Sequence, residues 1–296
     1  MIRKDKKTPE TVRRLGVHTS IAGGAHLSLE RAKDLGCNTI QIFSHNPRQW
    51  AVPDMPAGTA AAFRELRKAF NVHPVFIHTS YLINLAAGDP GILIKSIELL
   101  KRELDLADIL EADYVVIHTG SASGDSAAEA RRRAVEALRT MSGQQNWKAG
   151  LLLENTAGER GDITSRIADL AEIIDNVESP LIAGITIDTC HAFAAGYDIQ
   201  HTDGLSALID EISSRIGLDK VKLIHLNDAK KGLNSRVDRH WHIGQGEIGL
   251  EGLREFVNHP AFENVPLILE TPKKSEEDDP RNLNIVRSLL GMRLRK

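Results

Sequence analysis

Short apolar runs alternate along this chain with amphipathic stretches. The apolar runs are leucine-rich or β-branched and almost uninterrupted, which is typical of strands buried on both faces of a parallel sheet. Between them, hydrophobic residues recur at helical spacing, as at Ile97, Leu100 and Leu104 in the predicted helix 92–111. The predicted strands are residues 16–19, 39–43, 74–79, 114–119, 150–156, 184–189, 221–227 and 266–271.

This alternation predicts an α/β protein with a single (β/α)8 TIM barrel. Apolar residues around Phe63, Leu138 and Ile173 indicate further helices. A doubly wound open sheet is the alternative, but it would not bring the ends of so many strands into one pocket. In a barrel, all the carboxyl ends of the strands meet at one rim, where such enzymes do chemistry. We therefore expect one domain over residues 16–296 with its active site at the C-terminal rim, and a solvated turn at 276–280 before the last helix.

Composition adds few constraints to this picture. The chain has 296 residues, of which 42% are hydrophobic, enough for one large core. Residues 1–15 are basic and lack the apolar segment of a secretion signal, so we predict a flexible extension. No run approaches the ~18 apolar residues of a membrane span, and we expect a cytoplasmic protein without a membrane partner. Cys37 and Cys190 lack CxxC spacing and are interpreted as reduced thiols.

The net charge is −3 with histidine neutral, so it does not indicate a nucleic-acid-binding protein. It argues only mildly against one, because bound divalent ions would place positive charge at the site itself.

Metal-ligating side chains stand at the ends of most predicted strands. A lone histidine after a strand is most often structural, but the repetition is hard to explain in that way. Imidazole and carboxylate are ligands that zinc accepts, and one zinc ion takes only about four of them. The set suits several ions that share bridging carboxylates, an arrangement fitted to phosphodiester hydrolysis. The candidates are His78, His118, Glu154, Asp188, His191, His225 and Glu270 at or near strand ends, and Asp238 and His240 two residues apart in a polar loop.

The remaining histidines carry weaker signals. His18 ends the first strand and is expected near the site as a partner of a ligand, and His242 is read as a loop residue. The others are interpreted as surface or structural residues: His26, His45, His73, His201 and His259.

Two other functions remain open from the residues alone. A sugar isomerase or epimerase on the same barrel would hold one metal ion with a quartet of ligands, leaving the others without a use. A non-enzymatic module stabilised by zinc is less favoured, because structural zinc sites are closed and usually rich in cysteine. The isomerase quartet would be Glu154, Asp188, His225 and Glu270.

Longer segments around the candidate ligands resemble the bacterial endonuclease IV family, the zinc-dependent apurinic/apyrimidinic endonucleases of base-excision repair. The similarity runs from about Gly16 to about Met292, and Trp241, His242 and the N-terminal extension depart from the family pattern. The matching segments are HTSYLINLAAGDP (78–90), HTGS (118–121), LLLENTAG (151–158), IDTCHAFAAGYD (187–198), HLNDAKKGLNSRVDRHWHIGQGEIG (225–249) and LILETPK (267–273).

The resemblance implies a barrel with three zinc ions, with manganese as an alternative at some sites. It implies a monomer that cuts double-stranded DNA 5′ to an abasic site, leaving a 3′-hydroxyl and a 5′-deoxyribose phosphate, and that repairs blocked 3′ ends. Such an enzyme would work at the nucleoid. Glu154, Asp188 and Glu270 would be catalytic, with a hydroxide near Glu154 and Glu270 attacking phosphorus in line. The implied ligand groups are His78, His118 and Glu154; Glu154, Asp188, His225 and Glu270; and His191, Asp238 and His240.

Selection of the damaged nucleotide follows from energetics. A nucleotide without a base has no stacking or pairing to lose, so it flips out of the duplex at low cost. Apolar or planar side chains can then fill the gap. Tyr81, Leu82 and Arg48 are predicted wedges at positions to which the family resemblance also points, although a loop-packing role or a solvated charge is the alternative. Arg239 is predicted to hold a DNA phosphate, with Lys230, Lys231 and Arg236 as further candidates.

Overall fold

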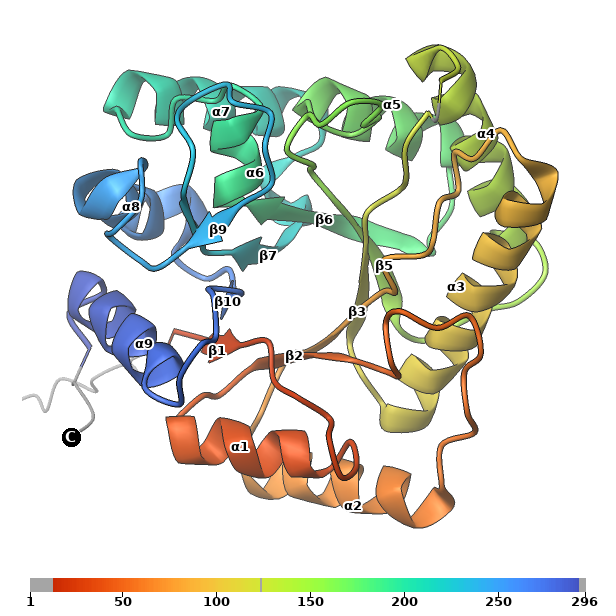
Figure 1. The fold of residues 1–296 in the computed structure, drawn as a ribbon, viewed down its shortest axis with the longest axis horizontal. Helices are drawn as coiled ribbons and strands as arrows, with labels where there is room; N and C mark the ends of the chain where they lie inside the picture. The colour runs from red at the N-terminus through yellow and green to blue at the C-terminus, as the bar shows by residue number, and fades with distance from the viewer. Residues whose placement is uncertain (1–12, 123, 293–296) are drawn as a thin grey trace, which may run out of the picture.

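A closed parallel barrel forms the centre of the molecule (Figure 1). The computed structural model describes residues 13–122 and 124–292. Eight parallel strands follow the order β1-β10-β7-β6-β5-β4-β3-β2, and a bridge between His18 and Gln41 joins the two ends of the sheet. The predicted barrel and its eight strands are confirmed. Their bounds are β1 Leu15–Val17, β2 Ile40–Phe43, β3 Val75–His78, β4 Tyr114–Ile117, β5 Gly150–Glu154, β6 Ile182–Asp188, β7 Val221–His225 and β10 Leu267–Leu269.

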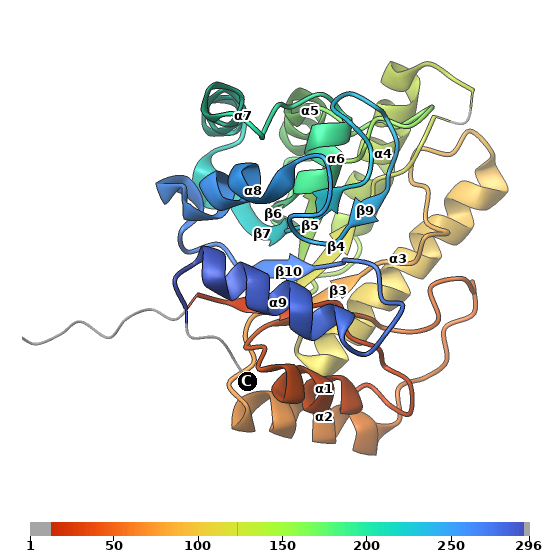
Figure 2. The same cartoon turned by 60° about the vertical axis from the view of Figure 1, so that its left-hand side comes forward.

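Helices surround the barrel on its outside (Figure 1, Figure 2). Local sequence sets where they begin: Asp89 accepts a hydrogen bond from the Ile92 N–H at 2.8 Å and Pro90 opens α3, while Ser126 caps α4. The bounds are α1 Leu27–Leu35, α2 Ala57–Ala69, α3 Pro90–Leu110, α4 Ala127–Ser142, α5 Ile167–Val177, α6 Thr189–Ala194, α7 Thr202–Arg215, α8 Gly249–Asn258 and α9 Asp278–Leu289, with short 3-10 turns at Leu218–Lys220 and Pro260–Phe262.

Two apolar clusters stabilise the fold. The larger one packs the outer faces of the strands against the helices. The smaller one fills the inside of the barrel, so the barrel is a packed core rather than a channel. Its buried members come from separate strands: Phe76, Val116, Leu152, Leu223 and Ile268.

The predicted polar loop after β7 contains a small antiparallel ribbon at the rim. Strand β8 (Asp228–Ala229) pairs with β9 (His240–Trp241). The buried Asp228 carboxylate accepts hydrogen bonds from the N–H groups of Gly246 at 2.9 Å and Ile248 at 3.0 Å. The ribbon therefore rests on a fixed base while the segment between its strands extends over the rim.

The described residues at both edges of the domain are held more firmly than the sequence predicts. The predicted solvated turn at 276–280 is wrong in part, because α9 already begins at Asp278. That side chain is buried and accepts hydrogen bonds from the N–H groups of Lys274 and Ser275 at 2.8 and 2.9 Å. Of the predicted flexible extension, residues 1–12 lie outside the described residues. The part that is described is held: Arg13 Nε donates to Val265 O at 3.0 Å, and β1 starts at Leu15.

Among the described helices, none is long and apolar enough to cross a membrane.

Candidate metal centre

The two-residue period of the strands places the candidate ligands inside the barrel mouth. Side chains two positions apart on a strand point to the same face. Each residue of the inner apolar cluster is therefore followed, two positions on, by a side chain that also points inward but one layer closer to the rim. The pairs are Phe76 and His78, Val116 and His118, Leu152 and Glu154, Leu223 and His225, and Ile268 and Glu270.

The structure gathers all of the predicted ligands into three groups, and a further group joins Asp188 and His240 with the buried Cys190. Within each group, one nitrogen or carboxylate oxygen of every member lies within 4.8 Å of the others. Glu154 belongs to two groups, so it stands where a bridging ligand would. The groups are His78, His118 and Glu154; Glu154, Asp188, His225 and Glu270; and His191, Asp238 and His240.

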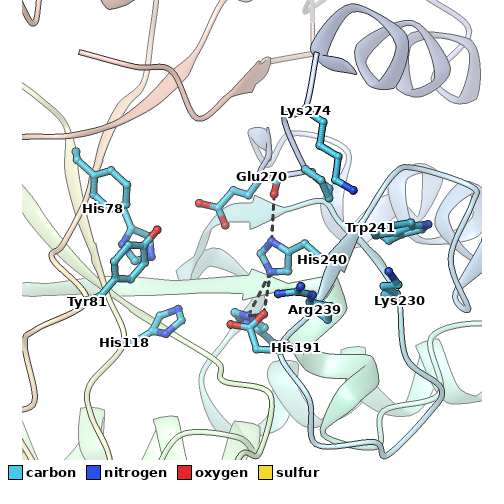
Figure 3. Close-up of a pocket in the computed structure, with 13 residues that line it drawn as sticks. His78, Tyr81, His118, His191, Lys230, Arg239, His240, Trp241, Glu270 and Lys274 are labelled. Carbon is cyan, nitrogen blue, oxygen red and sulfur yellow. Dashed lines mark hydrogen bonds and ion pairs between the residues drawn. The ribbon is translucent and has the colours of Figure 1, made fainter. Parts of the chain in front are cut away.

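Most of the histidines in these groups have one ring nitrogen occupied by a second partner. This nitrogen donates its proton, which leaves the lone pair of the other nitrogen directed toward the carboxylates. Figure 3 shows the rings of His78, His118, His191 and His240 around one cavity. The donors and acceptors are His78 Nδ1 to Thr79 O at 2.8 Å, His191 Nδ1 to Asn155 O at 2.9 Å, His225 Nε2 to Gln41 Oε1 at 2.7 Å and His240 Nδ1 to Glu270 O at 3.3 Å.

The chemistry of these donors fits metal ions. Glu154 Oε2 is buried and accepts no hydrogen bond from any described residue, although Nε2 of His118 and Nε2 of His78 lie 3.2 and 3.4 Å from it. Nε2 of His191 and Nε2 of His240 face each other at 3.3 Å, although each is the nitrogen left with a lone pair. A buried oxygen without a donor and two opposed lone pairs are both unfavourable unless positive charge lies among them. Divalent cations supply that charge.

Without metal ions, protons on the histidines balance the negative charge of the buried carboxylates. Burial would raise the pKa of Glu154, but the charges of His225 and His118 lower it well below its ordinary range. Burial opposes protonation of His225, but the charges of Glu154 and Glu270 raise its pKa to about 9. Protons and metal ions therefore compete for the same nitrogen atoms.

An amide that the sequence analysis missed connects three strands beneath the rim. Gln41 Nε2 donates to Glu270 Oε1 at 2.6 Å and lies 3.0 Å from His18 Nδ1, while Gln41 Oε1 accepts from His225. His18 itself lies 3.4 Å from Glu270 Oε1, near the site as predicted. A glutamine inside the apolar run TIQIF is the signal that could have identified this residue.

Two asparagines hold the Asp188 region in a similar way. Asn227 Nδ2 donates to Asp188 Oδ2 at 2.7 Å, and Asn227 Oδ1 accepts from the Glu270 N–H at 2.9 Å. Asn155 Oδ1 accepts from the Asp188 N–H at 2.8 Å. Asn155 directly follows the candidate ligand Glu154, and Asn227 lies two residues after His225. This spacing does not show which atoms the two amides would contact.

A cavity of about 470 Å³ opens above the ligands (Figure 3). Tyr81 and Arg239 line it, as do Lys230 and Lys274, whose ammonium groups lie 3.9 and 6.0 Å from the centre of the Trp241 ring. Three cationic side chains thus line the cavity beside the carboxylates of Asp238 and Glu270.

The predicted wedge residues occupy different positions relative to the cavity. Tyr81 is 66% exposed and packs edge-on against Phe43, with ring centres 5.3 Å apart. Leu82 is half-buried against the core, and Arg48 is exposed without lining this cavity. A second cavity of about 640 Å³ adjoins the first and is lined by Tyr81 and Pro47, the residue before Arg48.

Comparisons with known proteins agree with this geometry. A family model described as "Xylose isomerase-like TIM barrel" matches residues 29–293. A protein of Halothermothrix orenii named "Probable endonuclease 4" is 42% identical over 275 residues, covering 93% of this chain and 99% of that protein. A protein of the same name from Methanoculleus marisnigri is 42% identical over 278 residues, covering 94% and 99%.

Solved structures distinguish the endonuclease from the isomerase interpretation. The crystal structure of endonuclease IV from Thermus thermophilus matches with a TM-score of 0.83 and 38% identity, covering 94% of this chain and 99% of that one. A D-tagatose 3-epimerase-like protein matches with a TM-score of 0.71 but only 18% identity, covering 93% and 97%, which shows a shared fold alone. The chain therefore belongs to the endonuclease IV family and is a nuclease of the hydrolase class.

Proposed function

We propose that this chain is a DNA-repair apurinic/apyrimidinic endonuclease. It hydrolyses the phosphodiester 5′ to an abasic site in double-stranded DNA, leaving a 3′-hydroxyl and a 5′-deoxyribose phosphate, and it repairs blocked 3′ ends by the same chemistry. The observation that carries the proposal is the assembly of ligand groups beyond the single quartet that an isomerase would use. We also propose that the enzyme acts at the nucleoid and that it is a monomer.

We propose three zinc ions as the resident metals, with manganese as an alternative at one or more sites. The three ligand groups described above would hold them, with Glu154 shared by two. When bound, such ions polarise the phosphate, lower the pKa of water and stabilise the leaving oxygen. The opposed nitrogen atoms and the oxygen of Glu154 without a hydrogen bond support this assignment.

The three acidic residues predicted to be catalytic have different access to a substrate. Glu154 and Asp188 are fully buried, so they act by holding the centre together. The Glu270 side chain is 17% exposed and lines the cavity, which places it where it can meet the reacting phosphate and orient water. Gln41 fixes one Glu270 oxygen, so this carboxylate has a defined direction.

The rim residues suit a duplex with a missing base. Tyr81 projects from the rim on a packed aromatic base, which favours insertion into the gap in the stack. Leu82 and Arg48 are assigned the same wedge role on neighbouring loops. Arg239, Lys230 and Lys274 would bind backbone phosphates around the cavity.

A nicking assay tests this function. Metal-loaded protein is mixed with a duplex that carries one tetrahydrofuran abasic analogue, without added magnesium, beside an undamaged duplex. We expect one cut 5′ to the analogue and none in the control, and we expect Glu270→Gln and Asp188→Ala to lose most of the activity. A metal-loaded protein that leaves the analogue intact would favour the sugar isomerase, and ketose–aldose interconversion would then be measured.

A further inference from the structure

Glu103 is a buried carboxylate outside the metal centre. It lies on α3 and is 1% exposed, and burial raises its pKa to about 8. Its oxygens accept the Ser80 N–H at 3.0 and 3.4 Å, and Oε1 lies 3.4 Å from Nδ1 of His45, which is also buried. An ionisable group is costly to bury, so these contacts have to compensate.

The contact with Ser80 fixes the loop that carries Tyr81 and Leu82. Glu103 holds the Ser80 backbone, and the Ser80 hydroxyl accepts the Leu82 N–H at 3.2 Å. The same hydroxyl donates to Pro47 O at 2.7 Å, across to the loop after β2. The two wedge loops are therefore joined directly through one serine.

The contact with His45 fixes the loop that carries Arg48. His45 Nε2 donates to Gln49 O at 3.2 Å, while Pro47 O is held by Ser80. The residues on both sides of Arg48 are thus anchored to buried groups. His45 Nδ1 also lies 3.3 Å from the Ser44 hydroxyl. Because Nε2 carries a proton, Glu103 and His45 Nδ1 can bond only when a further proton lies between them.

We propose that Glu103 is a positioning residue for abasic-DNA recognition, which with His45 and Ser80 fixes the loop of Arg48 relative to the loop of Tyr81 and Leu82. This inference rests on the proposed wedge role of those residues. Its physical reason is preorganisation: ordering each mobile side chain on binding costs about 0.5–1.5 kcal/mol, and a fixed loop avoids part of that cost.

The test compares two substitutions of one residue. Glu103→Leu removes the acceptor for Ser80 and the partner of His45. Glu103→Gln keeps an acceptor for the Ser80 N–H in its amide oxygen, while its NH2 group takes the place of the second carboxylate oxygen. Leu104→Ala, a fully buried neighbour on α3, serves as a control for general destabilisation.

Four quantities are measured on metal-loaded protein: KM and kcat for the tetrahydrofuran duplex, metal content, and the fluorescence of 2-aminopurine opposite the analogue. For Glu103→Leu we expect KM to rise roughly tenfold or more, as loss of about one good hydrogen bond implies, with kcat changed far less. We also expect a reduced 2-aminopurine signal at saturating protein and normal metal content. Glu103→Gln and Leu104→Ala should keep the wild-type KM and fluorescence.

The results separate this inference from the proposed function. If wild-type protein does not cut the abasic duplex, the proposed function fails. If wild-type protein cuts and a folded Glu103→Leu variant keeps its KM and fluorescence, only the positioning role fails, and loss of metal in that variant would overturn it equally. If Glu103→Leu does not fold, Glu103→Asp, whose carboxylate is one methylene shorter and is drawn back from the Ser80 N–H, decides by the same measurements, with an unchanged KM as the contradicting result.

Discussion

Gln41 offers the sharpest test of how the centre is built, because it touches the ligands without belonging to them. The substitution Gln41→Leu keeps most of the side-chain volume but removes the donor to Glu270 Oε1 at 2.6 Å and the acceptor for His225 at 2.7 Å. Hydrogen bonds to charged groups contribute about 1.5–3 kcal/mol each. Loss of such outer partners typically weakens metal binding or activity by about 10–100-fold.

That range corresponds to about 1.4–2.7 kcal/mol, since each tenfold change is about 1.4 kcal/mol. This loss is smaller than the sum of the two hydrogen bonds, because water that enters the site is expected to replace part of their free energy. The loss should fall on the group that contains His225 and Glu270. Gln41 makes no side-chain hydrogen bond to His191, Asp238 or His240 in the described part of the chain, so that group should bind as before.

The assay is competition for zinc with a chromogenic chelator, together with kcat/KM on the tetrahydrofuran duplex. Gln145→Leu is a matched control, because Gln145 donates to Asp105 Oδ1 at 2.9 Å in the loop before β5, at the opposite end of the barrel. A Gln41→Leu protein that binds all its zinc within about twofold of wild type would refute the reasoning, since the expected range begins near tenfold.

Three further predictions concern the rim and its support. Because its folded pKa of about 8 lies above the ordinary 4.5, Glu103 binds an extra proton in the folded state between these values, so its contribution to stability is lost as pH rises through that window. The Tm of Glu103→Gln relative to wild type should therefore increase from pH 5 to pH 8, and a pH-independent difference would contradict this. The double variant Tyr81→Ala, Leu82→Ala should bind abasic duplex more weakly with unchanged metal content, and loss of zinc would count against the wedge role. Lys230→Met should lower the slope of log binding constant against log salt by about one, whereas Lys148→Met, far from the rim, should not.

The fold followed from the sequence because its signals are local and repeated. Runs such as those ending at His78 and Glu154 are apolar throughout, as strands covered on both faces must be. Since parallel strands in a barrel end at one rim, the meeting of residues far apart in the chain could be predicted without coordinates. The groups of side chains that the structure brings together include the three that the resemblance implies, and that these groups hold metal ions stays a prediction.

What the sequence did not reveal depends on partners that are distant along the chain. Gln41 and Asn227 are ordinary amides until the barrel places them against Glu270. The sequence indicates that His45 is a surface or structural residue, but it does not show the contact with Glu103, which a helical pattern presents as one more polar position. Asp278 was assigned to solvent because charged runs usually are solvated, whereas here its carboxylate binds two backbone N–H groups.

The closure of the barrel has a consequence for the order in which activity arises during synthesis. The ligand groups draw on residues from His78 to Glu270, and the ring of strands is complete only when β10 has paired with both β1 and β7. A nascent chain shorter than this holds some of the ligands but not a complete centre. Gln41, near the start, orients Glu270, near the end, so DNA cleavage should begin only after translation has passed the last strand and the ring has closed.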